Sequence, residues 1–184
     1  MEHIGSVIIE TERLLLVPIT MHYAEEIFNE FTREITVYMS PKPWKDISET
    51  QQFIQNAIQT MEDWTNYQAV ILDKKTREFL GCAWLHSATP QTPELGIRIK
   101  KSAFGKKIGR EAIVGLTNRA QKHLDFEYLF YPVDKDNIPS RKIAESIWWI
   151  VQKDTDGNEI IVDHKTTDPN SEIHWVEYRI YKKN

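Results

Sequence analysis

The order of the expected strands and helices predicts an α/β protein with a mixed sheet and helices packed on its faces. Two apolar runs joined by a polar turn, residues 68–73 and 79–87, are typical of a β-hairpin. The segments after it alternate strand, helix, strand, helix and strand between residues 94 and 181. The chain has 184 residues, 41% hydrophobic and 27% charged, which is the composition of one globular domain spanning residues 1–184.

The N-terminal third predicts one strand and two helices. Residues 14–17 have the apolar character of a buried strand that stops at Pro18, since proline cannot donate to a sheet ladder. A helix follows, because apolar residues recur with a period near 3.6: Tyr23, Ala24, Ile27, Phe28 and Phe31. Residues 37–46 predict a loop. Ser48 and Gln51 form a capping-box pattern before a second apolar stripe: Phe53, Ile54, Ala57, Ile58 and Met61.

The second half predicts three further strands and two helices. Residues 94–99 alternate, with Leu95, Ile97 and Ile99 on one face and Glu94, Gly96 and Arg98 on the other. A long amphipathic helix is marked by Ile108, Ala112, Ile113, Leu116, Ala120 and Leu124. Residues 128–133 predict a central strand, and Pro139 suits the first turn of a helix whose inner face is Ile143, Ala144 and Ile147. Asp156-Gly157 indicates a hairpin turn, and residues 175–181 predict the last strand.

Composition and charge exclude several classes of protein. The formal net charge of −4 argues against general nucleic-acid binding, which needs a positive surface. No apolar run approaches the ~18 residues of a membrane helix, and the N-terminus lacks the pattern of a secretory signal. The single cysteine, Cys82, excludes an intrachain disulfide and is expected to be a small core residue. No histidine pair has metal-ligand spacing. We therefore expect a cytoplasmic protein without a metal, membrane or nucleic-acid partner.

One segment, residues 98–110, is basic although the chain as a whole has a negative net charge. Six basic residues lie between positions 98 and 110, with no acidic residue among them: Arg98, Lys100, Lys101, Lys106, Lys107 and Arg110. The last three stand at the expected start of the long helix, where the helix dipole disfavours cations. A bound anion would reverse that preference, and Gly105 and Gly109 would let it approach the backbone. The alternative is a solvated basic helix end.

Four stretches of this sequence resemble the GNAT superfamily of N-acetyltransferases. Residues 105–112, Gly-Lys-Lys-Ile-Gly-Arg-Glu-Ala, are similar to its pyrophosphate-binding motif, Gln/Arg-x-x-Gly-x-Gly/Ala. When this segment is aligned with the motif at Gly109, Phe104 stands at the Gln/Arg position and Lys107 stands at the position of the first motif glycine. Residues 10–16, 94–97 and 137–140 resemble strings of the ribosomal-protein N-terminal acetyltransferase branch. The resemblance implies a central, mostly antiparallel twisted sheet with helices on both faces.

The resemblance also implies acetyl-CoA as co-substrate. The strand at 94–99 would splay from its neighbour, so that the main chain of Ile97, Arg98 and Ile99 pairs with the pantetheine arm. The pyrophosphate would lie on residues 104–110: Phe104, Gly105, Lys106, Lys107, Ile108, Gly109 and Arg110. Asn137 would contact the pantetheine, or alternatively form a helix cap.

Two residues are candidates for catalysis by this resemblance. Glu94 stands where many members place a base, although a solvated carboxylate is the alternative. The tyrosine that protonates the thiolate in many members is replaced by Ala144, whereas Ser140 matches a serine that can hydrogen-bond the sulfur. Ser140 could instead cap a helix. His86 is a further candidate for a base. Three tryptophans could line an acceptor pocket or serve the core: Trp44, Trp64 and Trp84.

The function expected on this resemblance is transfer of an acetyl group to a primary amine, by direct attack in a ternary complex. The amine would belong to a protein N-terminus or a small molecule. A non-catalytic acyl-CoA-binding or sensing module is the alternative, suggested by Lys107 and the missing tyrosine. Trp148-Trp149 replaces the Gly-Phe pair of the family, and residues 152–172 have no counterpart in it. The acceptor and a possible homodimer therefore stay open.

Overall fold

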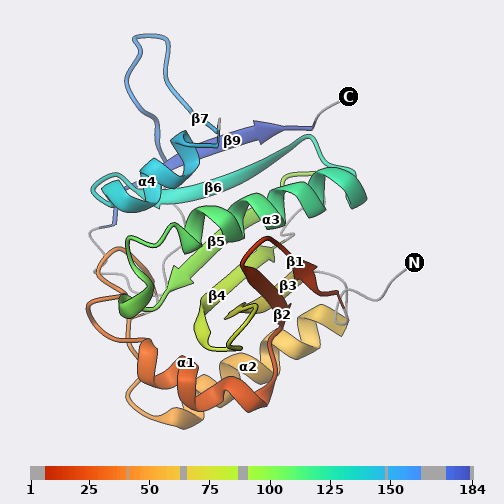
Figure 1. The fold of residues 1–184 in the computed structure, drawn as a ribbon. Helices are drawn as coiled ribbons and strands as arrows, with labels where there is room; N and C mark the ends of the chain where they lie inside the picture. Colours follow the sequence, from red (N-terminus) through yellow and green to blue (C-terminus); the bar gives the residue numbers. More distant parts are fainter. Residues whose placement is uncertain are drawn as a thin grey trace.

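The computed structural model describes residues 7–40, 42–62, 66–86, 91–147, 149–162 and 173–182. Its strands are β1 (Ile9–Glu10), β2 (Leu14–Pro18), β3 (Asn66–Asp73), β4 (Phe79–His86), β5 (Glu94–Ile99), β6 (Tyr128–Asp134), β7 (Ile150–Val151), β8 (Ile161–Val162) and β9 (Trp175–Tyr181). Within the described ranges they form one sheet in the order β1-β2-β3-β4-β5-β6-β9-β7, with β8 also paired to β9 (Figure 1). Only β5 and β6 run parallel among these pairs. The expected mostly antiparallel sheet is confirmed.

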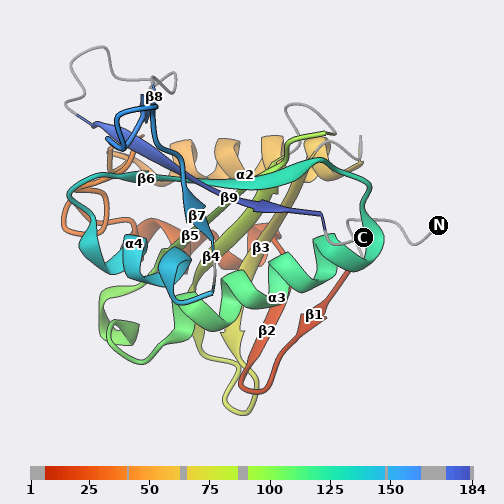
Figure 2. The same ribbon diagram turned by 90° about the horizontal axis from the view of Figure 1, so that it is seen from above.

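Helices cover both faces of the sheet, as expected. They are η2 (Met21–Tyr23), α1 (Ala24–Glu30), α2 (Ile47–Glu62), η3 (Lys101–Ala103), α3 (Ile108–His123) and α4 (Ile138–Glu145). Figure 2 shows α2 on one side of the strands and α3 and α4 on the other. Helix α1 packs against α2, and α3 packs against β4 and β5. No helix in the described part of the chain is long and apolar enough to cross a membrane.

The core lies between the sheet and these helices. Its fully buried side chains come from central strands and from the inner face of α3, and they include Leu14, Leu16, Ile71, Leu95, Ile113, Leu116 and Leu129. Burying a leucine or isoleucine side chain contributes roughly 1.5–3 kcal/mol. Cys82 is buried in β4, which confirms it as a small core residue, and burial raises the pKa of its thiol.

The start of α2 corrects the sequence-based prediction. The expected capping box was Ser48 with Gln51, but the helix begins at Ile47. Asp46 Oδ1 accepts from the backbone N–H of Ser48 at 2.8 Å, and Glu49 Oε1 accepts from the N–H of Asp46 at 3.3 Å. Asp46 and Glu49 therefore form the reciprocal box two residues earlier, because an aspartate accepts at an N-cap as well as a serine does.

The C-terminal edge of the sheet contains an interrupted strand. β7 pairs with β9 at Val151 and Tyr178, and β8 pairs with the same strand at Ile161 and Val176. Residues 153–160 leave the edge between these two pairings and return through a turn at Gly157, whose φ is 86°. The hairpin signal at Asp156-Gly157 is thus confirmed. Trp148 and residues 163–172 lie outside the described residues.

Candidate functional site

The sheet opens between its two parallel strands. β5 and β6 are paired only at Glu94 and Phe130, where the N–H of Phe130 donates to the Pro93 carbonyl at 3.0 Å. Beyond that point the strands diverge (Figure 1). The opening leaves peptide groups of β5 without a strand partner, and unpaired peptide groups bind amide-like ligands readily. The splay expected for residues 94–99 is present.

Some residues of β5 direct their peptide N–H and C=O groups toward β4, and others direct them toward the opening. The Lys100 N–H donates to the Leu80 carbonyl of β4 at 2.9 Å. Peptide groups of successive residues in a strand point to opposite edges, so Arg98 also faces β4, while Ile97 and Ile99 face the opening. The guanidinium of Arg98 lies 4.1 Å from the ring centre of Phe31. Of the three expected main-chain contacts, Ile97 and Ile99 have the required direction and Arg98 does not.

A cavity of about 250 Å³ lies at this opening. Its walls come from β4, β5, β6, β9, the start of α4 and residues 38–40: Tyr38, Met39, Ser40, Trp84, Glu94, Leu95, Gly96, Ile97, Tyr131, Pro132, Val133, Asp134, Asn137, Ser140 and Trp175. Glu94, Asn137 and Ser140, which the sequence places on separate elements, therefore share one cavity. The wall contains two acidic side chains and neither lysine nor arginine. A larger groove of about 690 Å³ runs along α3 and β1 and contains none of these three residues.

Glu94 begins β5, and its carboxylate accepts a hydrogen bond from the indole N–H of Trp84 at 3.4 Å. Burial raises the pKa of Glu94, the Trp84 hydrogen bond lowers it and the nearby charge of Glu177 raises it, with a net upward shift. A carboxylate whose pKa is raised accepts protons more readily, which suits a general base. Trp84 is the expected pocket tryptophan that lines the cavity, whereas Trp44 packs between Phe31 and Phe53. Trp64 lies outside the described residues.

His86 is the cross-strand neighbour of Glu94 on β4. Its ring contacts the side chain of Gln68 and does not line the cavity. Burial lowers the pKa of His86 to about 4, so the ring is neutral at physiological pH. The geometry favours Glu94 over His86 as the base.

Asn137 and Ser140 occupy the first turn of α4. Asn137 is the N-cap, and its Oδ1 accepts from the Ser140 N–H at 3.2 Å. The helix-cap reading of Asn137 is therefore correct, and its side chain also borders the cavity. The cap alternative for Ser140 is wrong, since that residue lies three positions further on and its hydroxyl is 2.6 Å from the hydroxyl of Tyr131. Ala144 is fully buried at the position of the missing tyrosine.

The loop before α3 has the backbone of an anion site. Residues 104–107 form a turn in which Gly105 has φ 73° and Lys107 has φ 61° and ψ 16°. The side chain of the N-cap residue, Lys107, makes no capping hydrogen bond. The N–H groups of Ile108, Gly109 and Arg110 lack intrahelical partners because no helical turn precedes them. Oriented N–H groups at a helix start bind phosphate. Phe104, the first residue of this turn, is exposed.

The side chains of the basic segment have different partners. Lys100 pairs with Glu78 at 2.5 Å and Lys101 with Glu34 at 2.8 Å. Arg110 reaches the last turn of α4, where its Nε donates to the hydroxyl of Ser146 at 3.1 Å. Lys106 and Lys107 make no ion pair with any residue that the structure describes. Among the described residues, neither of these two charges is compensated by a carboxylate.

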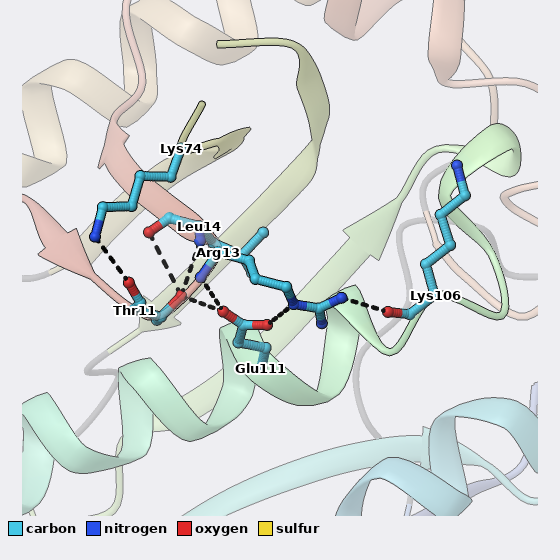
Figure 3. A network of polar contacts seen from close by, with 6 residues as sticks. All are labelled: Thr11, Arg13, Leu14, Lys74, Lys106 and Glu111. Atoms are coloured by element: carbon cyan, nitrogen blue, oxygen red, sulfur yellow. Dashed lines mark hydrogen bonds and ion pairs between the residues drawn. The ribbon is translucent and has the colours of Figure 1, made fainter. Parts of the chain in front are cut away.

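A polar network that sequence reasoning missed fixes this loop to the first hairpin of the sheet (Figure 3). Glu111, in the first turn of α3, accepts from the Thr11 hydroxyl at 2.5 Å and from Arg13 Nε at 2.6 Å. Arg13 Nη1 also donates to the Lys106 carbonyl at 3.2 Å. Thr11, Arg13 and Glu111 all lie within the stretches that carry the family resemblance, which was the available signal.

Gly109 lies where α3 approaches β5 and α4. A Cβ at this position would lie 2.7 Å from Cδ1 of Ile97 and 2.9 Å from Cδ1 of Ile143. Glycine therefore permits the close approach of three elements beside the opening. No cluster of histidine, cysteine, aspartate and glutamate in the described ranges could hold a metal ion.

Comparisons with known proteins agree with this geometry. Residues 13–147 match the family model of the acetyltransferase (GNAT) domain. An uncharacterized N-acetyltransferase, p20, of Bacillus licheniformis is 26% identical over 142 residues, 74% of this chain and 79% of that protein.

Solved structures share the fold at low sequence identity. A putative ribosomal-protein-serine acetyltransferase from Vibrio cholerae has a TM-score of 0.79 and 19% identity, covering 96% of this chain and 98% of that chain. Spermidine N-acetyltransferase from Vibrio cholerae in complex with CoA and spermine has a TM-score of 0.76 and 15% identity, covering 94% and 97%.

Proposed function

The chain belongs to the GNAT acetyltransferase family, whose members use acetyl-CoA, and from that membership we propose the acceptor and the residues that act. We propose that it transfers the acetyl group to a primary amine, of a protein N-terminus or a small molecule, by direct attack in a ternary complex. The observation that carries the proposal is the opening between β5 and β6, whose cavity brings Glu94, Asn137 and Ser140 together.

The residues present fit the two ends of acetyl-CoA. The start of α3, where the N-cap side chain makes no hydrogen bond and Lys106 and Lys107 stand in the preceding turn, suits the pyrophosphate. The open peptide edge of Ile97 and Ile99 suits the amide groups of the pantetheine arm. When bound, acetyl-CoA supplies an activated acetyl group as a thioester. Asn137, at the N-cap of α4, borders the cavity together with Ile97.

The protein supplies orientation, a base and a hydrogen-bond donor. Glu94 accepts a proton from the acceptor amine, directly or through water, and its raised pKa keeps it basic enough for that task. Ser140 donates a hydrogen bond toward the departing sulfur. The acidic wall of the cavity, with Glu94 and Asp134 and without cations, favours a positively charged acceptor before that proton is lost.

Binding and turnover are tested separately. A ligand that binds only the native state stabilises it by RT ln(1 + [L]/Kd), so millimolar acetyl-CoA should raise the melting temperature while acetate should not. A panel of amines and N-terminal peptides then tests turnover by release of the coenzyme A thiol. An unchanged melting temperature contradicts the coenzyme site. Binding without turnover on any amine would instead identify an acyl-CoA sensor.

A further inference from the structure

Two residues of the cavity wall are joined through their hydroxyl groups. Tyr131, on β6, and Ser140, on α4, place their side-chain oxygens 2.6 Å apart, and both residues line the cavity wall. Tyr131 is only 3% exposed. Its hydroxyl makes this hydrogen bond and no other with the residues that the structure describes.

Burial decides which hydroxyl donates. A buried donor without a partner destabilises the fold, and Ser140 is the one acceptor beside the Tyr131 hydroxyl among the described residues. Ser140 is less buried and faces the cavity, where a ligand or water can accept its proton. The favourable arrangement has Tyr131 donating to Ser140 Oγ, which leaves the proton of Ser140 to point into the cavity.

We propose that Tyr131 is a positioning residue for acetyl transfer, which fixes the Ser140 hydroxyl as a hydrogen-bond donor to the departing sulfur. The inference rests on the proposed function, since it assigns a role within that site. It also explains how the chain operates with Ala144 at the tyrosine position of α4: a tyrosine from the neighbouring strand acts through a serine.

Neither hydroxyl group forms or breaks a covalent bond during acetyl transfer. The amine nitrogen forms a bond to the acetyl carbon, the bond from that carbon to sulfur breaks, and the electron pair stays on sulfur. Glu94 takes the proton of the ammonium group before attack, and the second proton of that nitrogen, lost as the amide forms, leaves to solvent. Burial raises the pKa of Tyr131 to about 12, so Tyr131 stays neutral and is not a net proton donor to a thiolate of lower pKa. The pair stabilises the negative sulfur by a hydrogen bond to a charged group, which is the stronger kind.

The ring of Tyr131 is held independently of its hydroxyl. It packs edge-on against Trp149, with 6.1 Å between ring centres, and Trp149 is buried. Tyr131→Phe therefore removes the hydroxyl and keeps the packing. Tyr67→Phe is the matched control, because Tyr67 is equally buried and its hydroxyl donates to the Val7 and Leu16 carbonyls away from the cavity.

The first test uses coenzyme A bound to the protein and needs no turnover. A hydrogen bond to the thiolate lowers the pKa of the bound thiol. Ultraviolet titration of the thiolate should give a bound thiol pKa about one unit higher in Tyr131→Phe and in Ser140→Ala than in wild type, a change of about tenfold in thiolate binding. Tyr67→Phe should leave it unchanged. An unshifted thiol pKa in Tyr131→Phe overturns the inference.

The second test is a double-mutant cycle on turnover. Tyr131→Phe and Ser140→Ala should each lower kcat by about 10- to 100-fold with little change in KM for acetyl-CoA, and the double variant should be no slower than either one. Additive losses, or a loss confined to KM, would show that Tyr131 acts as structure alone. An active wild type whose kcat is unchanged in Tyr131→Phe refutes the inference and leaves the proposed function standing. A wild type that binds acetyl-CoA without turnover refutes the proposed function, and the thiol titration still decides the role of Tyr131.

Discussion

Arg13 and Glu111 lie 98 residues apart in the chain, and Arg13 Nε donates to Glu111 Oε2 at 2.6 Å (Figure 3). The same arginine donates through Nη1 to the Lys106 carbonyl in the loop before α3. One guanidinium thus joins the first hairpin of the sheet, the loop before α3 and the first turn of that helix. Because these contacts fix the N–H groups of the helix start, they should govern how well the loop binds an anion.

Glu111→Gln should weaken acetyl-CoA binding without slowing the chemical step. Loss of the charge weakens the Arg13 hydrogen bonds by roughly 1 kcal/mol, so KM for acetyl-CoA should rise about threefold to tenfold while kcat stays close to wild type. Steady-state kinetics and a binding titration measure both. Glu10→Gln is the control, since Glu10 lies in the same hairpin and pairs with Lys74 of the β3–β4 turn, not with Arg13. An unchanged KM in Glu111→Gln would show that the loop needs no such support.

The same carboxylate should make stability depend on acid pH. Burial acts to raise the pKa of Glu111, but hydrogen bonds from Thr11 and Arg13 outweigh it and hold the pKa below its usual value of 4.5. A group whose pKa is lowered by folding stabilises the protein above its unfolded pKa, and that stability is lost as pH falls through the folded value. The melting-temperature difference between wild type and Glu111→Gln should therefore be constant near neutral pH and shrink below about pH 4.5. A constant difference down to pH 3 would contradict it.

Lys107→Gly should stabilise the fold. Lys107 has left-handed backbone angles, with φ 61° and ψ 16°. That region costs a non-glycine residue about 1–2 kcal/mol, which the extra flexibility of glycine in the unfolded chain partly offsets. We expect a net gain of about 0.5–1 kcal/mol in the free energy of unfolding, measured by urea denaturation. Lys106→Gly removes the same charge at a neighbouring position without positive φ, so it should not stabilise.

Gly109 should accept alanine and reject valine. The Cβ of an alanine at this position would meet only the Cδ1 ends of Ile97 and Ile143 at close range, and these can rotate away. Valine adds two methyl groups, and overpacking of that size costs about 1–3 kcal/mol. Gly109→Ala should keep most of its acetyl-CoA affinity, whereas Gly109→Val should fold less stably and lose binding as Ile97 is displaced. Thermal melts with and without acetyl-CoA measure both effects. Normal binding by Gly109→Val would place the pyrophosphate elsewhere.

Sequence patterns predicted much of the secondary structure, because strand alternation and helix capping depend on residues that are close together in the chain. The strand at 94–99 begins and ends where alternation places it, and its residues divide between two faces as expected: Ile97 lies close to Gly109 of α3, and Arg98 lies against Phe31. The start of α2 was misplaced by two residues, since Ser-x-x-Gln and Asp-x-x-Glu are both capping patterns and only packing selects one. The sequence offered no means to choose between them.

The tertiary contacts of the candidate site were not predictable in the same way. The bond between Tyr131 and Ser140 depends on how α4 lies against β6, and the Arg13–Glu111 contact joins distant segments. The excursion at residues 153–160 also depends on β9, which offers one edge to two short strands. Glu159 within it pairs with Arg141 of α4, so this segment is fixed by contacts that no local pattern contains.

The pH dependence of turnover should identify Glu94 as the base. Only the ionised carboxylate accepts a proton, so kcat/KM should fall at acid pH with an apparent pKa above that of an ordinary glutamate, because burial raises the pKa of Glu94. Glu94→Gln should lower the rate by about 100-fold or more, with partial recovery at high pH, where the amine loses its proton to solvent.

Two substitutions beside Glu94 should shift the acid limb of the pH profile, the range in which kcat/KM falls, in opposite directions. The charge of Glu177 raises the pKa of Glu94, so Glu177→Gln should shift the limb to lower pH. The Trp84 indole N–H lowers the same pKa by donating at 3.4 Å, so Trp84→Phe should shift the limb to higher pH. Neither change removes the base, so the rate on the plateau should survive better than in Glu94→Gln. If both variants keep the wild-type limb, the group that titrates is not Glu94, and His86 becomes the residue to change next.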